Sequence, residues 1–386
     1  MKVWILIFIC MFSMPLLVAV LHFRMRKGQI LKIRQDYVKD ARYFGKSFSA
    51  LVEKALPEMK NGTIMLSRQE KVFEADGNQE FAQPDIEDLV IARNTIFCPQ
   101  QNDLHFQKEI YSEKDALFVK ENIRIRAVYS KKRLLFGNKI RLLRWADAEH
   151  AVAVYDECDL GERVSSGEQL VIGFDNVFHS LYAPVIRLGQ RPEEPDRFME
   201  ERDPRIFRMP VMNSHEYNRH YIDDDMVTES GTVPYTIISR GDIKVIEDII
   251  LQGDIHSDGA VRIMENASVL GNVFAENDIL LEKNVTVLGD IFTQGNIIFE
   301  EGASAGQPGK ITSVVARGTI TFYGGNYVYG YVVSEGGGEI LKSDREVLGE
   351  YCFPSEPVHE EKITFRDLSE YENVSFQGFR GDIYVK

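Results

Sequence analysis

The sequence predicts an all-β chain folded as a right-handed parallel β-helix of triangular cross-section, with about 18 residues in each coil. Between residues 241 and 294 the chain repeats every 18 residues, and a fourth repeat begins at Gly295. Within each repeat, three corner positions separate three short segments of alternating polarity. This is the pattern of a coil whose apolar edge is covered by the next coil.

The apolar positions of the repeats recur in register, which predicts columns of inward-facing side chains. A helical repeat would need about 33 residues per unit and a 3.6-residue period, and neither is present. A chance run of valine and glycine would not keep an 18-residue register at this many positions. The expected columns are Ile243/Val261/Ile279/Ile297, Val245/Ile263/Leu281/Phe299, Leu251/Val269/Val287 and Ile255/Val273/Ile291.

The corners between the segments also align. They hold glycine, asparagine and aspartate, the residue types that tolerate a positive φ. All three corner columns can therefore accommodate left-handed backbone, and they are Gly241/Gly259/Asn277/Gly295, Asp248/Asn266/Asn284/Gly302 and Gly253/Gly271/Gly289.

Length and charge limit the classes of function. A chain of 386 residues has room for two or three domains, and a net charge of −14 argues against a nucleic-acid partner. The four cysteines are scattered singly, without a disulfide framework or the paired spacing of metal ligands. We predict no metal and no cofactor.

The amino terminus predicts a membrane anchor over residues 1–23. Val3–Phe23 is a 21-residue apolar run, long enough to span the hydrocarbon core. A cleaved signal peptide is the alternative, but no small-x-small cleavage site follows the run. Basic side chains crowd its carboxyl side, so the positive-inside rule predicts a single-pass protein of the cell membrane with a cytoplasmic body. The residues expected at the membrane surface are Arg24, Arg26, Lys27, Lys32 and Arg34.

Residues 24–60 predict a basic amphipathic juxtamembrane helix, with ten Lys/Arg against four Asp/Glu. Apolar residues recur at helical spacing, and three partners fit them equally: an anionic membrane surface, a coiled-coil seam or the next domain. The expected stripe is Ile30, Ile33, Tyr37, Ala41, Phe44, Phe48, Leu51 and Ala55.

The rest of the chain divides into five regions. Residues 61–112 form a connecting region, and 113–186 carry a looser repeat that predicts an earlier stretch of the same β-helix. Its expected columns are Ile123/Ile140/Cys158/Val177 and Ile125/Leu142/Leu160/His179. Residues 187–234, with five of the 13 prolines, form a proline-rich acidic insertion. The main β-helix covers 235–335 and has a five-residue insertion within 302–312, and 336–386 form a carboxyl-terminal cap or tail.

Few residues suggest catalysis. Asp254, Asn272 and Asp290 form a ladder beside a glycine corner, where such residues usually cap their own turns. His215, His220 and Asp223–Asp225 match no ligand spacing, and Ser165 and Ser166 lack a partner histidine. No glycine-rich loop is placed to cradle phosphate. We predict no enzyme activity.

The last strong coil is rich in aromatic residues. A β-helix has open ends that are either capped or used for pairing, so this coil is our candidate for self-assembly unless the tail covers it. The candidate residues are Phe322, Tyr323, Tyr327, Tyr329 and Tyr331.

The repeats GDIKVIED…LQGDIHSD, GAVRIMENASVLGNVFAE and NDILLEKNVTVLGDIFTQ resemble the bactofilins, the polymer-forming cytoskeletal proteins of bacteria. The resemblance is strongest over 235–335. It implies a scaffold that polymerises through its β-helix without nucleotide at the cytoplasmic membrane face, with itself, the membrane and other envelope-related proteins as partners. The membrane span, the insertion and the tail depart from the family's short form. The alternative is a carbohydrate-active or carbohydrate-binding β-helix exposed outside the cytoplasm.

Overall fold

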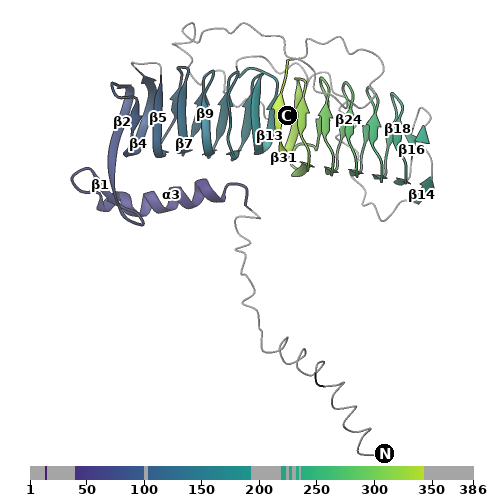
Figure 1. Ribbon diagram of the computed structural model, residues 1–386, viewed down its shortest axis with the longest axis horizontal. Coiled ribbons are helices and arrows are strands. Elements are labelled where there is room, and N and C mark those ends of the chain that lie inside the picture. Colours follow the sequence, from purple (N-terminus) through teal and green to yellow (C-terminus); the bar gives the residue numbers. More distant parts are fainter. Residues whose placement is uncertain are drawn as a thin grey trace, which may run out of the picture. The chain divides into compact units, whose positions relative to one another are not determined.

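The computed structural model describes residues 14, 40–99, 103–192, 219–222, 226–227, 232–233 and 236–342. The chain divides into two compact units, Met1–Tyr43 and Phe44–Lys386. The second unit is a β-solenoid of about 12 coils with about 18 residues per coil, which confirms the prediction of a repetitive parallel β-helix (Figure 1).

The predicted anchor Val3–Phe23 lies outside the described residues, apart from Met14. The five basic residues expected at the membrane surface, Arg24, Arg26, Lys27, Lys32 and Arg34, also lie outside them. Among the residues that are described, no helix is both long and apolar enough to cross a membrane.

The solenoid consists of two arms. Arm 1 winds from β2 to β13, and its strands pair in parallel with those of the next coil. It begins within the predicted connecting region, so residues 61–112 already contain coils. The bounds are β2 Gln69–Phe81, β3 Asp85–Ile86, β4 Leu89–Pro99, β5 Leu104–Ser112, β6 Ala116–Phe118, β7 Ile123–Ser130, β8 Arg133–Phe136, β9 Arg141–Ala148, β10 Ala151–Val154, β11 Arg163–Ser166, β12 Gln169–Ile172 and β13 Asn176–Leu188.

Arm 2 winds from β14 to β31, mostly in strands of two or three residues. Its bounds are β14 Arg219–Ile222, β15 Met226–Val227, β16 Thr232–Val233, β17 Thr236–Ser239, β18 Ile243–Val245, β19 Ile250–Leu251, β20 Ile255–Ser257, β21 Val261–Ile263, β22 Ser268–Val269, β23 Val273–Ala275, β24 Ile279–Leu281, β25 Thr286–Val287, β26 Ile291–Thr293, β27 Ile297–Phe299, β28 Ser304–Ala305, β29 Thr312–Ala316, β30 Ile320–Phe322 and β31 Asn326–Ile340.

The two arms run in opposite directions. The last strand of arm 1, β13, pairs antiparallel with the last strand of arm 2, β31, so the arms meet at their carboxyl-terminal coils. Figure 1 shows β13 and β31 side by side in the middle of the row of strands, with β2 and β14 at its two ends. Residues 113–186 are thus coils of the same solenoid as 235–335, but the two stretches run in opposite directions.

A helix covers one side of arm 1. The helix α3 (Tyr43–Ala55) continues into the short 3-10 helix η1 (Leu56–Glu58) and then β1 (Thr63–Met65), which pairs antiparallel with β2. Val52 on α3 packs with Tyr111, Tyr129 and Trp145 of the solenoid. Of the three partners considered for residues 24–60, the next domain is the one that α3 contacts.

The predicted core columns of arm 2 are confirmed. Ile243 pairs with Val261, Val261 with Ile279 and Ile279 with Ile297, and all four are buried. The five-residue insertion is also confirmed, because Ile291 pairs with Val314 at a spacing of 23 instead of 18. All the inward residues of both arms belong to one continuous apolar core.

The three corner columns differ in backbone conformation. Only the middle column is left-handed, with φ of 60° at Asp248, 58° at Asn266, 57° at Asn284 and 75° at Gly302. At Gly289 there is no room for a side chain, because a Cβ would lie 2.3 Å from the carbonyl oxygen of Gly271. Glycine is needed there because successive backbones approach closely as they stack.

One predicted register in arm 1 is wrong by one residue. Asp159 pairs with Val177, which places Cys158 beside Asn176 and Leu160 beside Phe178. Val177 and His179 therefore point outward and are exposed. The 18-residue spacing holds here, whereas the expected columns required 19.

Candidate functional site

The junction between the arms is formed by ten residue pairs of β13 and β31. The pairing runs from Asn176 with Ile340 to Leu188 with Asn326, and two irregularities interrupt its register. Further backbone bonds cross the junction, including Asp175 N–H to the Ile340 carbonyl at 2.6 Å. The coil edges that would otherwise be open thus satisfy each other's backbone groups.

Aromatic rings fill the interior of the junction. The Phe178 ring of arm 1 lies 6.2 Å from that of Phe322 in arm 2, and Phe322 stacks on Phe299 at 4.6 Å. On the outside, Tyr182 and Tyr331 lie 4.6 Å apart. The apolar cores of arm 1 and arm 2 are therefore continuous across this contact.

Close backbone approach also requires glycine at the junction. A Cβ at Gly189 would lie 2.3 Å from the Cα of Gly324, and one at Gly338 would lie 2.2 Å from the Phe178 ring. Any larger residue at these positions would push the arms apart, so the junction depends on glycine.

The five residues predicted for self-assembly all lie in the coil that forms this junction. Phe322, Tyr327 and Tyr329 are buried, and Tyr323 and Tyr331 are partly exposed. Within the described residues, the coil is covered by β13 of arm 1. Assembly of separate molecules through this edge would require the two arms to separate first.

The two halves of the junction are built alike. Each final coil begins with a fully buried asparagine, Asn176 in arm 1 and Asn326 in arm 2. The Asn176 amide donates to the Tyr155 carbonyl, and the Asn326 amide donates to the Glu300 carbonyl at 2.6 Å. The junction therefore has the character of a two-fold dimer interface within one chain.

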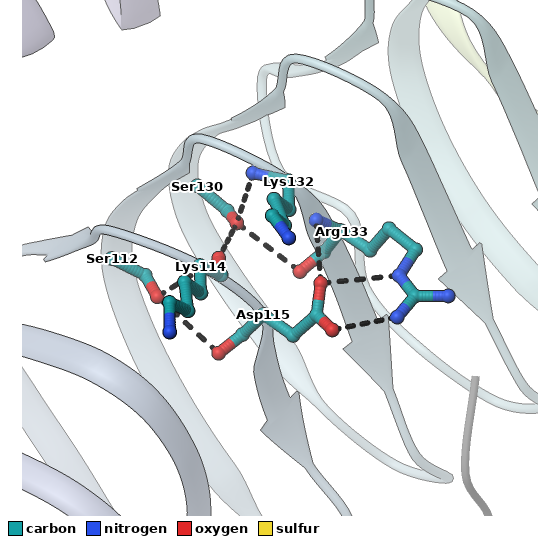
Figure 2. A network of polar contacts seen from close by, with 6 residues as sticks. All are labelled: Ser112, Lys114, Asp115, Ser130, Lys132 and Arg133. Atoms are coloured by element: carbon teal, nitrogen blue, oxygen red, sulfur yellow. Dashed lines mark hydrogen bonds and ion pairs between the residues drawn. The ribbon is translucent and has the colours of Figure 1, made fainter.

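Polar corners repeat the same chemistry along both arms. In arm 1, Ser130 Oγ donates to the carbonyl of Lys114 one coil earlier and accepts the Lys132 N–H at 3.1 Å (Figure 2). In arm 2, Ser257 Oγ donates to the Gly241 carbonyl at 2.9 Å and accepts the Gly259 N–H. These serines tie successive coils together, which explains their polarity without catalysis.

An ion pair reinforces the arm-1 corner. The Arg133 guanidinium donates to both carboxylate oxygens of Asp115, with Nη2 2.7 Å from Oδ2 (Figure 2). Such a bidentate pair between adjacent coils fixes their register.

The predicted carboxylate ladder caps the backbone of the next coil. Asp254 Oδ1 accepts the Asn272 N–H at 2.8 Å, Asn272 Oδ1 accepts that of Asp290 at 2.9 Å, and Asp290 Oδ1 accepts that of Ser313 at 2.7 Å. The ladder thus bonds to backbone, as expected, but each side chain caps the next coil and not its own turn.

The other candidates for catalysis come together only in part. Ser165 Oγ donates to the buried Asp147 carboxylate at 2.7 Å, and Ser166 Oγ donates to the His150 carbonyl. His215 and Asp223–Asp225 lie outside the described residues, and of His220 only the backbone is described. In the described part of the chain, no group of three His, Cys, Asp or Glu side chains could hold a metal ion.

A polar network holds α3 on arm 1. Lys131 Nζ lies 2.8 Å from Glu53 Oε1, which also accepts hydrogen bonds from Ser49 and Tyr111. The hydrogen bond from Lys131 lowers the pKa of Glu53. Burial raises the pKa of Tyr111 to about 12, so this phenol stays a neutral donor. No local pattern reveals this network, because its members are spread over residues 49–131.

Burial raises the pKa of three carboxyl groups, Glu157 and Asp175 in arm 1 and Glu300 in arm 2. Burial raises the pKa of Glu157 to about 7, at a corner where it has a φ of 62°. Burial also raises the pKa of Glu300 to about 7, and the neighbouring Glu282 adds to the effect. Glu157 and Glu300 both lie near corners of the solenoid.

The geometry defines a class of protein: a two-armed β-solenoid whose polar groups serve coil stacking. Comparisons with protein-family models, with curated proteins and with solved structures find no match for this chain.

Proposed function

We propose that this protein is a bactofilin-like scaffold, anchored in the cell membrane with its body in the cytoplasm, that self-assembles through its β-helix without nucleotide. The observation that carries the proposal is the junction, where two coil edges of this solenoid pair over ten residues. Because two coil edges pair within this chain, the coil edges of two separate chains can pair through the same backbone hydrogen bonds.

The outer ends of the two arms supply edges for such assembly. Within the described residues, Val72–Phe81 of β2 pairs only with β4, and β14, β15 and β16 pair only with β17, β18 and β19. Phe73 and Ile86 lie partly buried at the arm-1 end of the core. A second copy added there would bury apolar surface and satisfy backbone groups at once.

Self-association of the purified full-length chain tests the proposal. We expect filaments or higher oligomers without nucleotide by electron microscopy and sedimentation. Phe73→Glu at the arm-1 end should reduce association, whereas Met65→Glu, at an exposed position of β1, should not. A strictly monomeric protein at high concentration would count against assembly.

The membrane part of the proposal has a separate test. A reporter fused to the carboxyl end should be active only if that end stays in the cytoplasm. Activity of a reporter that requires export would instead favour the carbohydrate-binding alternative.

One observation weighs against the carbohydrate alternative. The rings of His256, Phe274 and Phe292 stack on one another, with centroids 4.5 and 5.5 Å apart and interplanar angles of 13° and 6°. Their faces are turned toward each other along the ladder, so a sugar ring cannot lie flat on them.

A further inference from the structure

One sheet of the solenoid continues through both arms, and its outward side can be followed residue by residue. Trp145 in β9 pairs with Arg163 in β11, and Ser180 in β13 pairs with Val333 in β31. From Val333 the pairs lead into arm 2 through Val315, Phe292, Phe274, His256 and Ile238. We name these six arm-2 residues, Val333 to Ile238, the arm-2 stripe.

In arm 1 this outward side is covered by an amphipathic helix. The helix α3 buries Tyr111 and Tyr129 to 1% exposure each, and its Phe48 lies 5.7 Å from Trp145, ring to ring. At Gly45 a Cβ would lie 2.3 Å from the Asp147 carboxylate, so the helix backbone approaches the sheet closely. This side of the solenoid is thus a surface on which a helix packs.

In arm 2 no described residue covers the same side. Phe292 is 42% exposed, His256 is exposed, and Phe274, Val315, Val333 and Ile238 are partly exposed. A row of five apolar side chains and one histidine over six coils is unusual on a free surface and marks an interaction site.

The charges beside the stripe indicate the sign of the partner. In the coils that carry His256, Phe274 and Phe292, the charged residues flanking the stripe are all acidic. They are Asp254 and Asp290 on one side, and Asp258 and Glu276 on the other. Beside the other three stripe residues the charged side chains are Arg240, Arg317 and Glu335, so the acidic flank is confined to the middle of the stripe. Arm 2 as a whole is acidic, with 14 Asp/Glu against seven Lys/Arg in residues 236–342.

We propose that the arm-2 stripe binds a basic amphipathic helix of a partner protein, lying along arm 2 as α3 lies along arm 1. Its apolar face would pack on Phe274 and Phe292, and its lysines or arginines would pair with the flanking carboxylates. Six coils spaced at about 4.8 Å extend over about 24 Å, which corresponds to about 16 residues of helix. The proposal does not depend on self-assembly or on the membrane anchor.

A synthetic 18-residue amphipathic helix of leucine and lysine is the probe, with fluorescence anisotropy as the readout. The full-length chain in a neutral detergent should bind it saturably, and added salt should weaken binding. A scrambled peptide of the same composition, a leucine–glutamate peptide and detergent alone are the controls. Equal binding of either control peptide would overturn the proposal.

Variants locate the site. Phe292→Asp should weaken binding about tenfold or more, because it removes a ring from the apolar contact. Leu143→Asp is the matched control, since Leu143 is 40% exposed in arm 1 away from the stripe, and it should bind as the wild type does. Asp258→Lys combined with Glu276→Lys changes only exposed charges and should also weaken binding. Circular dichroism verifies that each variant is folded.

Three results would assign the stripe to another occupant and overturn the proposal. No binding to the wild-type chain would mean that another segment of this chain covers the stripe. Self-association lost in Phe292→Asp would indicate a second copy. Adsorption to phosphatidylcholine vesicles, lost in the same variant and without peptide binding, would indicate a lipid surface.

Discussion

Arm 1 and arm 2 share a coil but differ in what lies outside it. In arm 1, residues that point out of the sheet, such as Tyr111, Tyr129 and Trp145, are buried under α3. In arm 2 the outward residues of the same sheet alternate with buried ones, as in β20, where Ile255 and Ser257 are buried and His256 is exposed. Because α3 covers these outward residues, buried and exposed positions do not alternate in the part of arm 1 beneath the helix.

This difference explains why one repeat is conspicuous in the sequence and the other is not. A strand buried on both sides needs apolar residues at successive positions, so the two-residue period disappears. The second half of β7 is buried throughout, as is that of β9. Arm 2 has no such cover in the described residues, and its 18-residue pattern is correspondingly strict.

The largest effect should come from charging the core of arm 2. Val269 is fully buried between Leu251 and Val287. Val269→Asp buries an unpaired charge and should lower the free energy of unfolding by about 3–5 kcal/mol. Urea unfolding followed by circular dichroism measures the loss.

The same variant tests whether the arms are separable. Trp145 reports on arm 1, provided that the other tryptophan of the chain, Trp4, is replaced by phenylalanine. We expect its fluorescence transition to persist in Val269→Asp. Simultaneous loss of both signals would show that the arms unfold as one unit. Gln294→Asp, at an exposed corner, is the control and should change stability by less than about 0.5 kcal/mol.

A smaller effect should follow from crowding the junction. A Cβ at Gly338 would overlap the Phe178 ring, so Gly338→Ala should cost about 2–3 kcal/mol. In a Phe178→Ala background the same substitution should cost at least about 1 kcal/mol less, because the ring is gone. Strictly additive effects in this double-mutant cycle would contradict the junction geometry.

Removing contacts under α3 should affect arm 1 alone. Val52 is fully buried, and Val52→Ala should destabilise the arm-1 transition by about 2 kcal/mol. Leu51→Ala is the matched control, because Leu51 is 45% exposed and its truncation should cost less than about 0.5 kcal/mol. Equal effects would mean that the opposite face of α3 packs on the sheet.

The smallest effect concerns pH. The pKa of Glu300 is raised from 4.5 to about 7 in the folded chain, so between these values the folded state binds more protons than the unfolded state. Stability should therefore fall as pH rises from 5 to 8, and Glu300→Gln should reduce this fall by about 1 kcal/mol. Equal pH dependence in both proteins, from urea unfolding at each pH, would refute the assignment.

Much of arm 2 could be predicted from its residues, because each inward position repeats against its neighbour 18 residues away. The columns of Ile243 and Val245 and the five-residue insertion could be predicted from spacing. A backbone-capping role for Asp254 could be predicted from residue type, but not that it caps the next coil. The positive φ at Asn266 and Asn284 also followed from residue type. The 18-residue period and the residue types at each position are sufficient to predict these features.

The direction of the arms could not be predicted. Periodicity reports which residues face inward but is unchanged when an arm is reversed, so it could not reveal that β13 and β31 pair antiparallel. Gly189, Gly324 and Gly338 allow the close approach of the two arms at the junction, yet in the sequence they resemble ordinary turn glycines. The face of α3 that packs on arm 1 was also not predicted. Gly45 and Ser49 form part of this buried face, and neither is a large apolar residue that a hydrophobic pattern would reveal.

The antiparallel junction also determines when the molecule can be completed during synthesis. The partners of β13 are made about 150 residues after it, and at 5–20 residues per second this delay is about 8–30 s. Arm 1 can wind as it emerges, but its last coil must keep an unpaired edge until arm 2 has formed. For that interval, the nascent chain exposes an edge that could pair with another nascent chain on the same message.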